Sequence, residues 1–152
     1  MIRIIVCLIL AFPLLAKGQS KGDSIIGVWF NQEKTAKLQI SNEDGAYFGK
    51  IVWLQAKHDK ATLYTDKTNP DSSMHTDSLM GMTVMRHFTF GSKDTYRGGI
   101  IYDHMNGKEY KCNMVLIGGQ FLMIVGYTGI PTMSRSMEWQ RVKLRSNEST
   151  GL

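Results

Sequence analysis

Residues 46–54 read AYFGKIVWL, and this stretch decides between a helical and a β fold. Its aromatic and β-branched residues suit a pleated sheet, and its glycine would weaken a helix interior. In a strand, Tyr47, Gly49, Ile51 and Trp53 share one face, and the opposite face is also largely apolar. We therefore expect a strand that wraps around a buried interior.

Similar β-type runs, separated by turn residues, fill most of the chain after residue 24. The predicted strands are residues 25–31, 36–41, 47–54, 81–90, 95–103, 109–117, 120–127 and 136–144. Three dipeptides, Asp44-Gly45, Asn106-Gly107 and Gly118-Gly119, are typical of tight hairpins. They predict antiparallel pairing of strands two and three, five and six, and six and seven. The one long connection, Gln55–Met80, is expected to carry a short helical turn around residues 71–76.

Eight sequential antiparallel strands can form a sandwich or a closed barrel, and the alternation favours the barrel. Tyr110, Cys112, Met114 and Leu116 share one face of their predicted strand, opposite polar neighbours. Closure removes exposed sheet edges, and an eight-stranded barrel is about the smallest that can hold a small ligand. In this reading Gly49 relieves crowding at a bend or leaves room for a ligand.

The chain start predicts export. Arg3 precedes an apolar run, Ile4–Leu15, that is too short to span a bilayer comfortably. Small residues in Ala16–Gly18 then provide a cleavage site before Gln19. We expect a signal peptide over residues 1–18, a single barrel domain over 19–145 and a polar, flexible tail over 146–152, with the mature protein periplasmic or secreted.

Charge and cysteine content argue against a nucleic-acid partner and against an intramolecular disulfide. Removal of the predicted signal lowers the net charge from +5 to +3, and no Lys/Arg cluster indicates a nucleic-acid partner. Cleavage also removes Cys7, which leaves Cys112 without an intramolecular disulfide partner. The mature domain is therefore expected to depend on its hydrophobic core, with no stable transmembrane segment; the oligomeric state stays open.

Gly27-x-Trp29 on the first predicted strand and Arg141 on the last are neighbours in a closed barrel. The guanidinium can then stack on the indole across the seam. This combination resembles the structural signature of lipocalin-like, or calycin, barrels. Its expected role is to close one end of the barrel.

The order of motifs along the chain resembles the bacterial domain-of-unknown-function 2147 family. The motifs are Gly27-Val28-Trp29, Gly49-Lys50-Ile51-Val52-Trp53-Leu54, Asp66 with Asn69-Pro70-Asp71, Leu79-Met80-Gly81-Met82, Gly98-Gly99-Ile100-Ile101-Tyr102-Asp103, Asn106-Gly107-Lys108-Glu109-Tyr110, Gly126-Tyr127-Thr128-Gly129 and Trp139-Gln140-Arg141-Val142. The resemblance implies a small exported protein with a lipocalin-like barrel and no established activity. The chain departs from the family pattern at His75, His104 and Val125, where the family more often has basic residues or proline.

No catalytic motif is visible, so we expect neither a catalytic site nor a cofactor or metal. The four histidines lie on different predicted elements, and Cys112 is expected to be a buried, inert thiol. The loop residues Asp66, Asn69 and Asp71 have oxygen atoms that could bind Ca²⁺, but their pattern is more typical of Asx-type turns.

These observations favour a non-enzymatic binding protein that takes a small apolar or amphipathic ligand inside the barrel, with the long connection near its mouth. The alternative is a structural or interaction protein of the cell envelope with a filled barrel. The residues expected to line the ligand site alternate along their strands so that they face the barrel interior, and a β-bulge would reverse this alternation. They are Tyr47, Ile51, Trp53, Met114, Phe121, Met123 and Tyr127.

Overall fold

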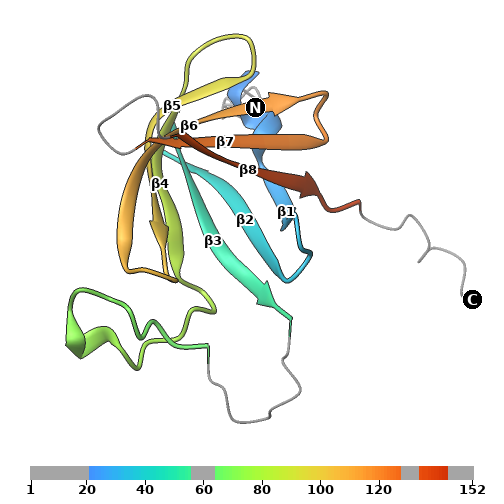
Figure 1. The fold of residues 1–152 in the computed structure, drawn as a ribbon. Coiled ribbons are helices and arrows are strands. Elements are labelled where there is room, and N and C mark those ends of the chain that lie inside the picture. Colours follow the sequence, from blue (N-terminus) through green and yellow to red (C-terminus); the bar gives the residue numbers. More distant parts are fainter. Residues whose placement is uncertain (1–20, 56–63, 128–133, 144–152) are drawn as a thin grey trace, which may run out of the picture.

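In a computed structural model the chain forms a closed barrel of eight antiparallel strands in sequence order (Figure 1). The structure describes residues 21–55, 64–127 and 134–143. The strands are β1 (Gly27–Asn31), β2 (Ala36–Glu43), β3 (Ala46–Leu54), β4 (Thr83–Phe90), β5 (Thr95–Asp103), β6 (Lys108–Ile117), β7 (Phe121–Tyr127) and β8 (Ser134–Arg141), and the short 3-10 helices are η1 (Lys21–Ile25) and η2 (Ser72–Met74). The predicted all-β barrel is confirmed, including a short helical turn in the long connection.

Turn chemistry fixes the sequential pairing. Asp44 and Gly45 both have positive φ, 52° and 88°, and Gly118 and Gly119 have 55° and 69°. Such paired left-handed residues form the tight turns that match the twist of two antiparallel strands. The predicted pairings β2–β3, β5–β6 and β6–β7 are all present.

The first strand begins later than the sequence suggests. We expected a strand from residue 25, but Lys21–Ile25 forms η1 and β1 begins at Gly27. Side chains from inside the barrel hold η1 in place: Trp29 Nε1 donates to the Ile25 carbonyl at 3.0 Å, and the Tyr96 hydroxyl donates to the Gly22 carbonyl at 2.6 Å. These bonds compete successfully with strand formation because they occupy backbone carbonyls that would otherwise be buried without a partner.

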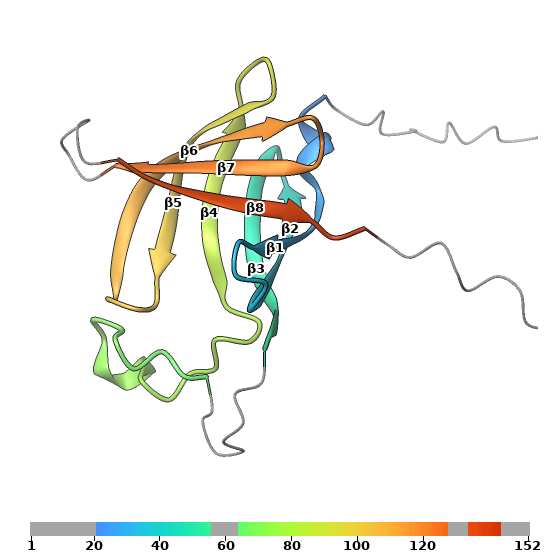
Figure 2. The same ribbon diagram turned by 45° about the vertical axis from the view of Figure 1, so that its right-hand side comes forward.

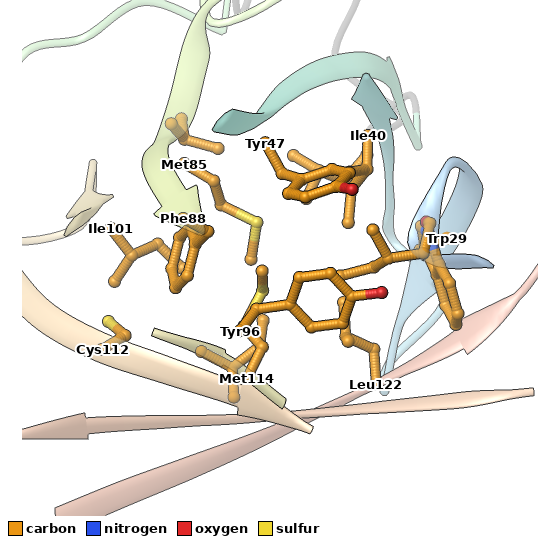
Figure 3. Close-up of a cluster of buried hydrophobic side chains, with 14 of the residues drawn as sticks. Trp29, Ile40, Tyr47, Met85, Phe88, Tyr96, Ile101, Cys112, Met114 and Leu122 are labelled. Carbon is orange, nitrogen blue, oxygen red and sulfur yellow. The ribbon is translucent and has the colours of Figure 1, made fainter. Parts of the chain in front are cut away.

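Side chains from β1 to β7 form one buried cluster inside the barrel, and Trp139 of β8 packs against it (Figure 3). The labelled members are Trp29, Ile40, Tyr47, Met85, Phe88, Tyr96, Ile101, Cys112, Met114 and Leu122. Trp29, Phe88 and Tyr96 are completely buried. The strand alternation therefore places a continuous apolar core in the barrel, as its sequence predicts.

A β-bulge near the end of β3 changes which side chains reach this core. Leu38 is paired with Ile51 and Lys37 with Trp53, so Val52 is the extra residue. A single extra residue reverses the inward and outward alternation of everything that follows it. Beyond the bulge Leu54, not Trp53, faces the interior opposite Ala36.

No helix among the described residues is long and apolar enough to cross a membrane.

Candidate functional site

Three of the seven candidate lining residues lie in the buried core. Tyr47 and Ile51 reach it from β3, and Met114 reaches it from β6. Gly49 lies between the first two, but it leaves no room for a ligand. A Cβ there would come within 2.9 Å of both Leu38 Cδ2 and Met85 Sδ. Its expected role in relieving crowding therefore fits the structure, whereas space for a ligand at this position does not.

Trp53 is on the outer face of the barrel, which corrects its expected interior position. The bulge at Val52 directs the indole outward, where it meets Phe30 edge to face with the ring centroids 6.1 Å apart. Lys37 Nζ lies 4.9 Å from the Phe30 centroid and 5.2 Å from that of Trp53. This small external cluster is stabilised by ring packing and cation–π attraction.

Phe121 and Met123 also face outward, so their expected interior position is wrong. Leu122 and Ile124, by contrast, are completely buried. All four side chains are apolar, so hydrophobic alternation cannot distinguish the two faces of this strand. Its pairing with β6 decides the register, because buried Met114 lies directly opposite Ile124. The side chain of Tyr127 lies outside the described residues, although its backbone is paired within β7.

Arg141 closes the end of the barrel at which η1 lies. Its guanidinium carbon is 4.1 Å from the centroid of the Trp29 ring. Nε donates to the Gly119 carbonyl at 2.7 Å, and Nη1 donates to the Ile26 carbonyl at 2.9 Å. A Cβ at Gly27 would lie only 2.6 Å from Nη1. The glycine of the Gly-x-Trp pattern is therefore required because the guanidinium passes directly over it.

Two tyrosines complete this closed end. The Tyr47 hydroxyl donates to Asp23 Oδ1 at 3.0 Å, and the Tyr47 and Tyr96 rings meet edge to face with centroids 5.2 Å apart. Burial raises the pKa of the Tyr96 hydroxyl above its ordinary value. The half of the barrel nearest η1 is thus filled and sealed.

The opposite end is less completely covered. Met137 on β8 lies across from buried Ile124 and so faces inward, yet 39% of its surface is exposed. Trp139 lies across from Leu122 on the same inward face and is only partly buried. The seam explains this exposure: β8 is paired with β1 only as far as Trp139–Asn31, so the β1 side of Met137 has no strand beside it. Part of this inward-facing apolar side chain is therefore left uncovered by the described residues.

The described part of the long connection, residues 64–82, packs on this same end of the barrel, opposite η1 (Figure 2). Leu79 enters the core, and Tyr64 and Met82 pack against it. The backbone joins β3 through Gly81 N to Ile51 O at 2.8 Å and Ile51 N to Met82 O at 2.9 Å.

The polar residues of this connection make turns among themselves. Asp71 Oδ1 caps η2 by accepting from Ser73 Oγ at 2.7 Å and from Ser73 N at 3.0 Å, and these two hydrogen bonds lower the pKa of its carboxyl. Asn69 Oδ1 accepts from Asp71 N at 2.9 Å, while Asn69 Nδ2 donates to Asp66 Oδ2 at 2.7 Å. This is turn chemistry. Within the described ranges, no three His, Cys, Asp or Glu side chains converge where a metal could bind.

Cys112 lies in the core on β6, and burial raises the pKa of its thiol to about 11. A thiol that stays protonated at neutral pH is a poor nucleophile. Its Sγ lies 3.2 Å from the Tyr110 carbonyl, to which it donates. This side chain acts as a small apolar group of the interior.

Met137 and Trp139 are the site residues that the sequence reasoning missed. The signal for them was present, because they lie four and two residues before Arg141 on one strand and so share its inward face. Tyr110, which the sequence placed inward without making it a candidate, is also partly buried against the core.

A closed eight-stranded antiparallel barrel with one end covered by η1, Trp29 and Arg141 has the architecture of a lipocalin-like barrel. A solved structure described as protein HP1028 from the human pathogen Helicobacter pylori, which belongs to the lipocalin family, matches with a TM-score of 0.67 and 20% identity, over 78% of this chain and 82% of that one. A family model described as "Uncharacterized protein conserved in bacteria (DUF2147)" matches residues 27–141, and the chain belongs to this family. A comparison with proteins of curated function found no match.

Proposed function

We propose that the protein binds a small apolar or amphipathic molecule at the end of the barrel opposite η1. The observation that carries this proposal is the exposure of inward-facing Met137, together with partly buried Trp139 beside it. Apolar side chains that face an interior and remain accessible can be covered by an apolar ligand. Methionine also adapts its shape to irregular ligands. The lipocalin-like fold supports the proposal by analogy alone.

The filled half of the barrel favours the alternative in part. Trp29, Phe88 and Tyr96 occupy the space near η1 completely, as in a barrel without a ligand. The exposure of Met137 and the burial of these three rings are both compatible with a ligand that enters only the half of the barrel away from η1. An envelope protein with no ligand remains the second candidate, and the following experiment separates the two.

The three tryptophans provide an internal test of where a ligand binds. Trp29 is buried near η1, Trp53 is on the outer face and Trp139 faces inward at the accessible end. A brominated fatty acid quenches indole fluorescence only on contact. We expect it to quench the wild-type protein and the Trp53→Phe variant, and to lose most of this effect in Trp139→Phe. Equal quenching of Trp139→Phe and wild type would place the ligand elsewhere, and no quenching in any variant would favour the filled barrel.

We further propose that the protein is exported and that residues 1–18 are removed. The support is the basic start, the apolar run and the small residues before Gln19. N-terminal sequencing of protein recovered from the cell envelope or the medium should begin at or within a few residues of Gln19. An envelope form that retains Met1 would contradict the proposal.

A further inference from the structure

Asp66 is a completely buried carboxylate at the base of residues 64–82. The Tyr102 hydroxyl, from β5, lies 2.8 Å from each of its two oxygens, and Asn69 Nδ2 donates to Oδ2 at 2.7 Å. A carboxylate out of water is costly unless it is hydrogen-bonded. Tyr102 therefore compensates the burial of Asp66, but only while residues 64–82 remain seated on the barrel.

A second set of contacts joins the same segment to the turn between β5 and β6. Thr68 Oγ1 donates to the His104 carbonyl at 2.6 Å. Gly107 is buried beneath Thr68, and a Cβ at this glycine would lie 1.9 Å from the Thr68 carbonyl oxygen. The segment is thus docked closely on the β5–β6 hairpin, and this docking is mainly polar.

Apolar anchoring of residues 64–82 is limited by comparison. Leu79 is the fully buried hydrophobic side chain of this segment, while Met74 and Met80 are exposed. Segments with few buried apolar contacts open at a lower free energy than the strands of a core. Opening would also return the Asp66 carboxylate to water, which offsets part of the loss of its hydrogen bonds.

We propose that residues 64–82 form a lid over the end of the barrel opposite η1, and that the contact between Tyr102 and Asp66 is the latch that holds this lid closed. The inference rests on the proposed function, because the lid would control passage of the ligand to the interior beneath Leu79. The latch joins a strand of the rigid barrel to a segment held mainly by polar contacts, so breaking it releases the lid without unfolding the barrel.

Hydrogen exchange on the full chain tests the latch without a ligand. Tyr102→Phe removes the donor to both Asp66 oxygens. We expect at least tenfold faster exchange at the two amides that join the lid to β3, that of Gly81, which donates to the Ile51 carbonyl, and that of Ile51, which donates to the Met82 carbonyl. Exchange in β6 and β7 should stay unchanged. Thr68→Val, which removes the bond to His104 and keeps the side-chain shape, should act in the same direction and serves if Tyr102→Phe fails to fold.

Asp71→Ala is the matched control, because Asp71 caps η2 within the lid and its side-chain bonds go to Ser73. It should accelerate exchange only around η2. Unchanged exchange across residues 64–82 in Tyr102→Phe, or equal acceleration throughout the barrel, would overturn the latch.

A stopped-flow measurement with the brominated fatty acid tests the gating role separately. If the lid controls passage, Tyr102→Phe should raise the association and dissociation rates by a similar factor and leave the affinity nearly unchanged. Faster hydrogen exchange with unaltered probe rates would overturn the gate. Failure of the wild type to bind any probe would overturn the ligand proposal, and the exchange data would still report on the latch.

Discussion

Substitution of Arg141 by alanine should destabilise the barrel by about 2–4 kcal/mol. The guanidinium donates to the carbonyls of Ser24, Ile26 and Gly119 and stacks on Trp29. Hydrogen bonds to a charged group contribute about 1.5–3 kcal/mol each when buried. We reduce that sum because the side chain is only partly buried and water can reach the freed carbonyls, and we add about 0.5–2 kcal/mol for the cation–π contact.

Urea denaturation followed by tryptophan fluorescence measures this loss, provided that the dependence on denaturant is unchanged between variants. Arg141→Lys should lose about half as much, since an ammonium is a compact group that does not span three separated carbonyls. Arg97→Ala is the control: this arginine lies on the exposed face of β5, and its loss should change stability by less than about 0.5 kcal/mol. A similarly small loss for Arg141→Ala, or no coupling with Trp29→Leu, which removes the aromatic ring, in a double-mutant cycle, would refute the reasoning.

Two further predictions follow from the core. Leu122→Ala should cost about 2–5 kcal/mol and Met123→Ala less than about 1 kcal/mol by urea denaturation, because the first side chain faces inward and the second outward; equal losses would contradict the register of β7. Stability should also fall as pH rises from about 9 to about 11, because the Cys112 thiol ionises near 9.0 when unfolded but near 11 when folded. The folded state then binds more protons than the unfolded state, and the pKa difference corresponds to about 2–3 kcal/mol in all. Cys112→Ala should flatten the slope of stability against pH in this window, and an unchanged slope would show that other groups cause it.

Turn chemistry and strand alternation made the barrel predictable from the sequence. Asp44-Gly45 and Gly118-Gly119 adopt the paired positive φ values that such dipeptides favour, and these turns set the order of the strands. The seam was predictable as well, because the first and last strands of a closed barrel must meet and each carries one half of the Trp29–Arg141 contact.

The candidate site was harder to predict because it required deciding which residues face the barrel interior in strands that are apolar on both faces. Phe121 and Leu122 are both large and apolar, and only pairing with β6 decides which one is buried. Trp53 was misplaced by the bulge at Val52, which a uniform alternation cannot reveal. The Asp66–Tyr102 contact joins residues 36 apart in the sequence, and neither residue alone indicates it.

Ligand protection of an introduced thiol tests the central claim most directly. Met137→Cys and Met123→Cys place a cysteine on the inward and the outward face of adjacent strands, with Cys7 replaced by serine. The Cys112 thiol should stay unlabelled near neutral pH, because burial raises its pKa to about 11. Alkylation is then timed with and without a saturating fatty acid. If the ligand lies at the end of the barrel opposite η1, it should slow alkylation of Met137→Cys at least tenfold and leave Met123→Cys unchanged. Equal rates for Met137→Cys with and without the fatty acid would contradict a binding site at that end of the barrel.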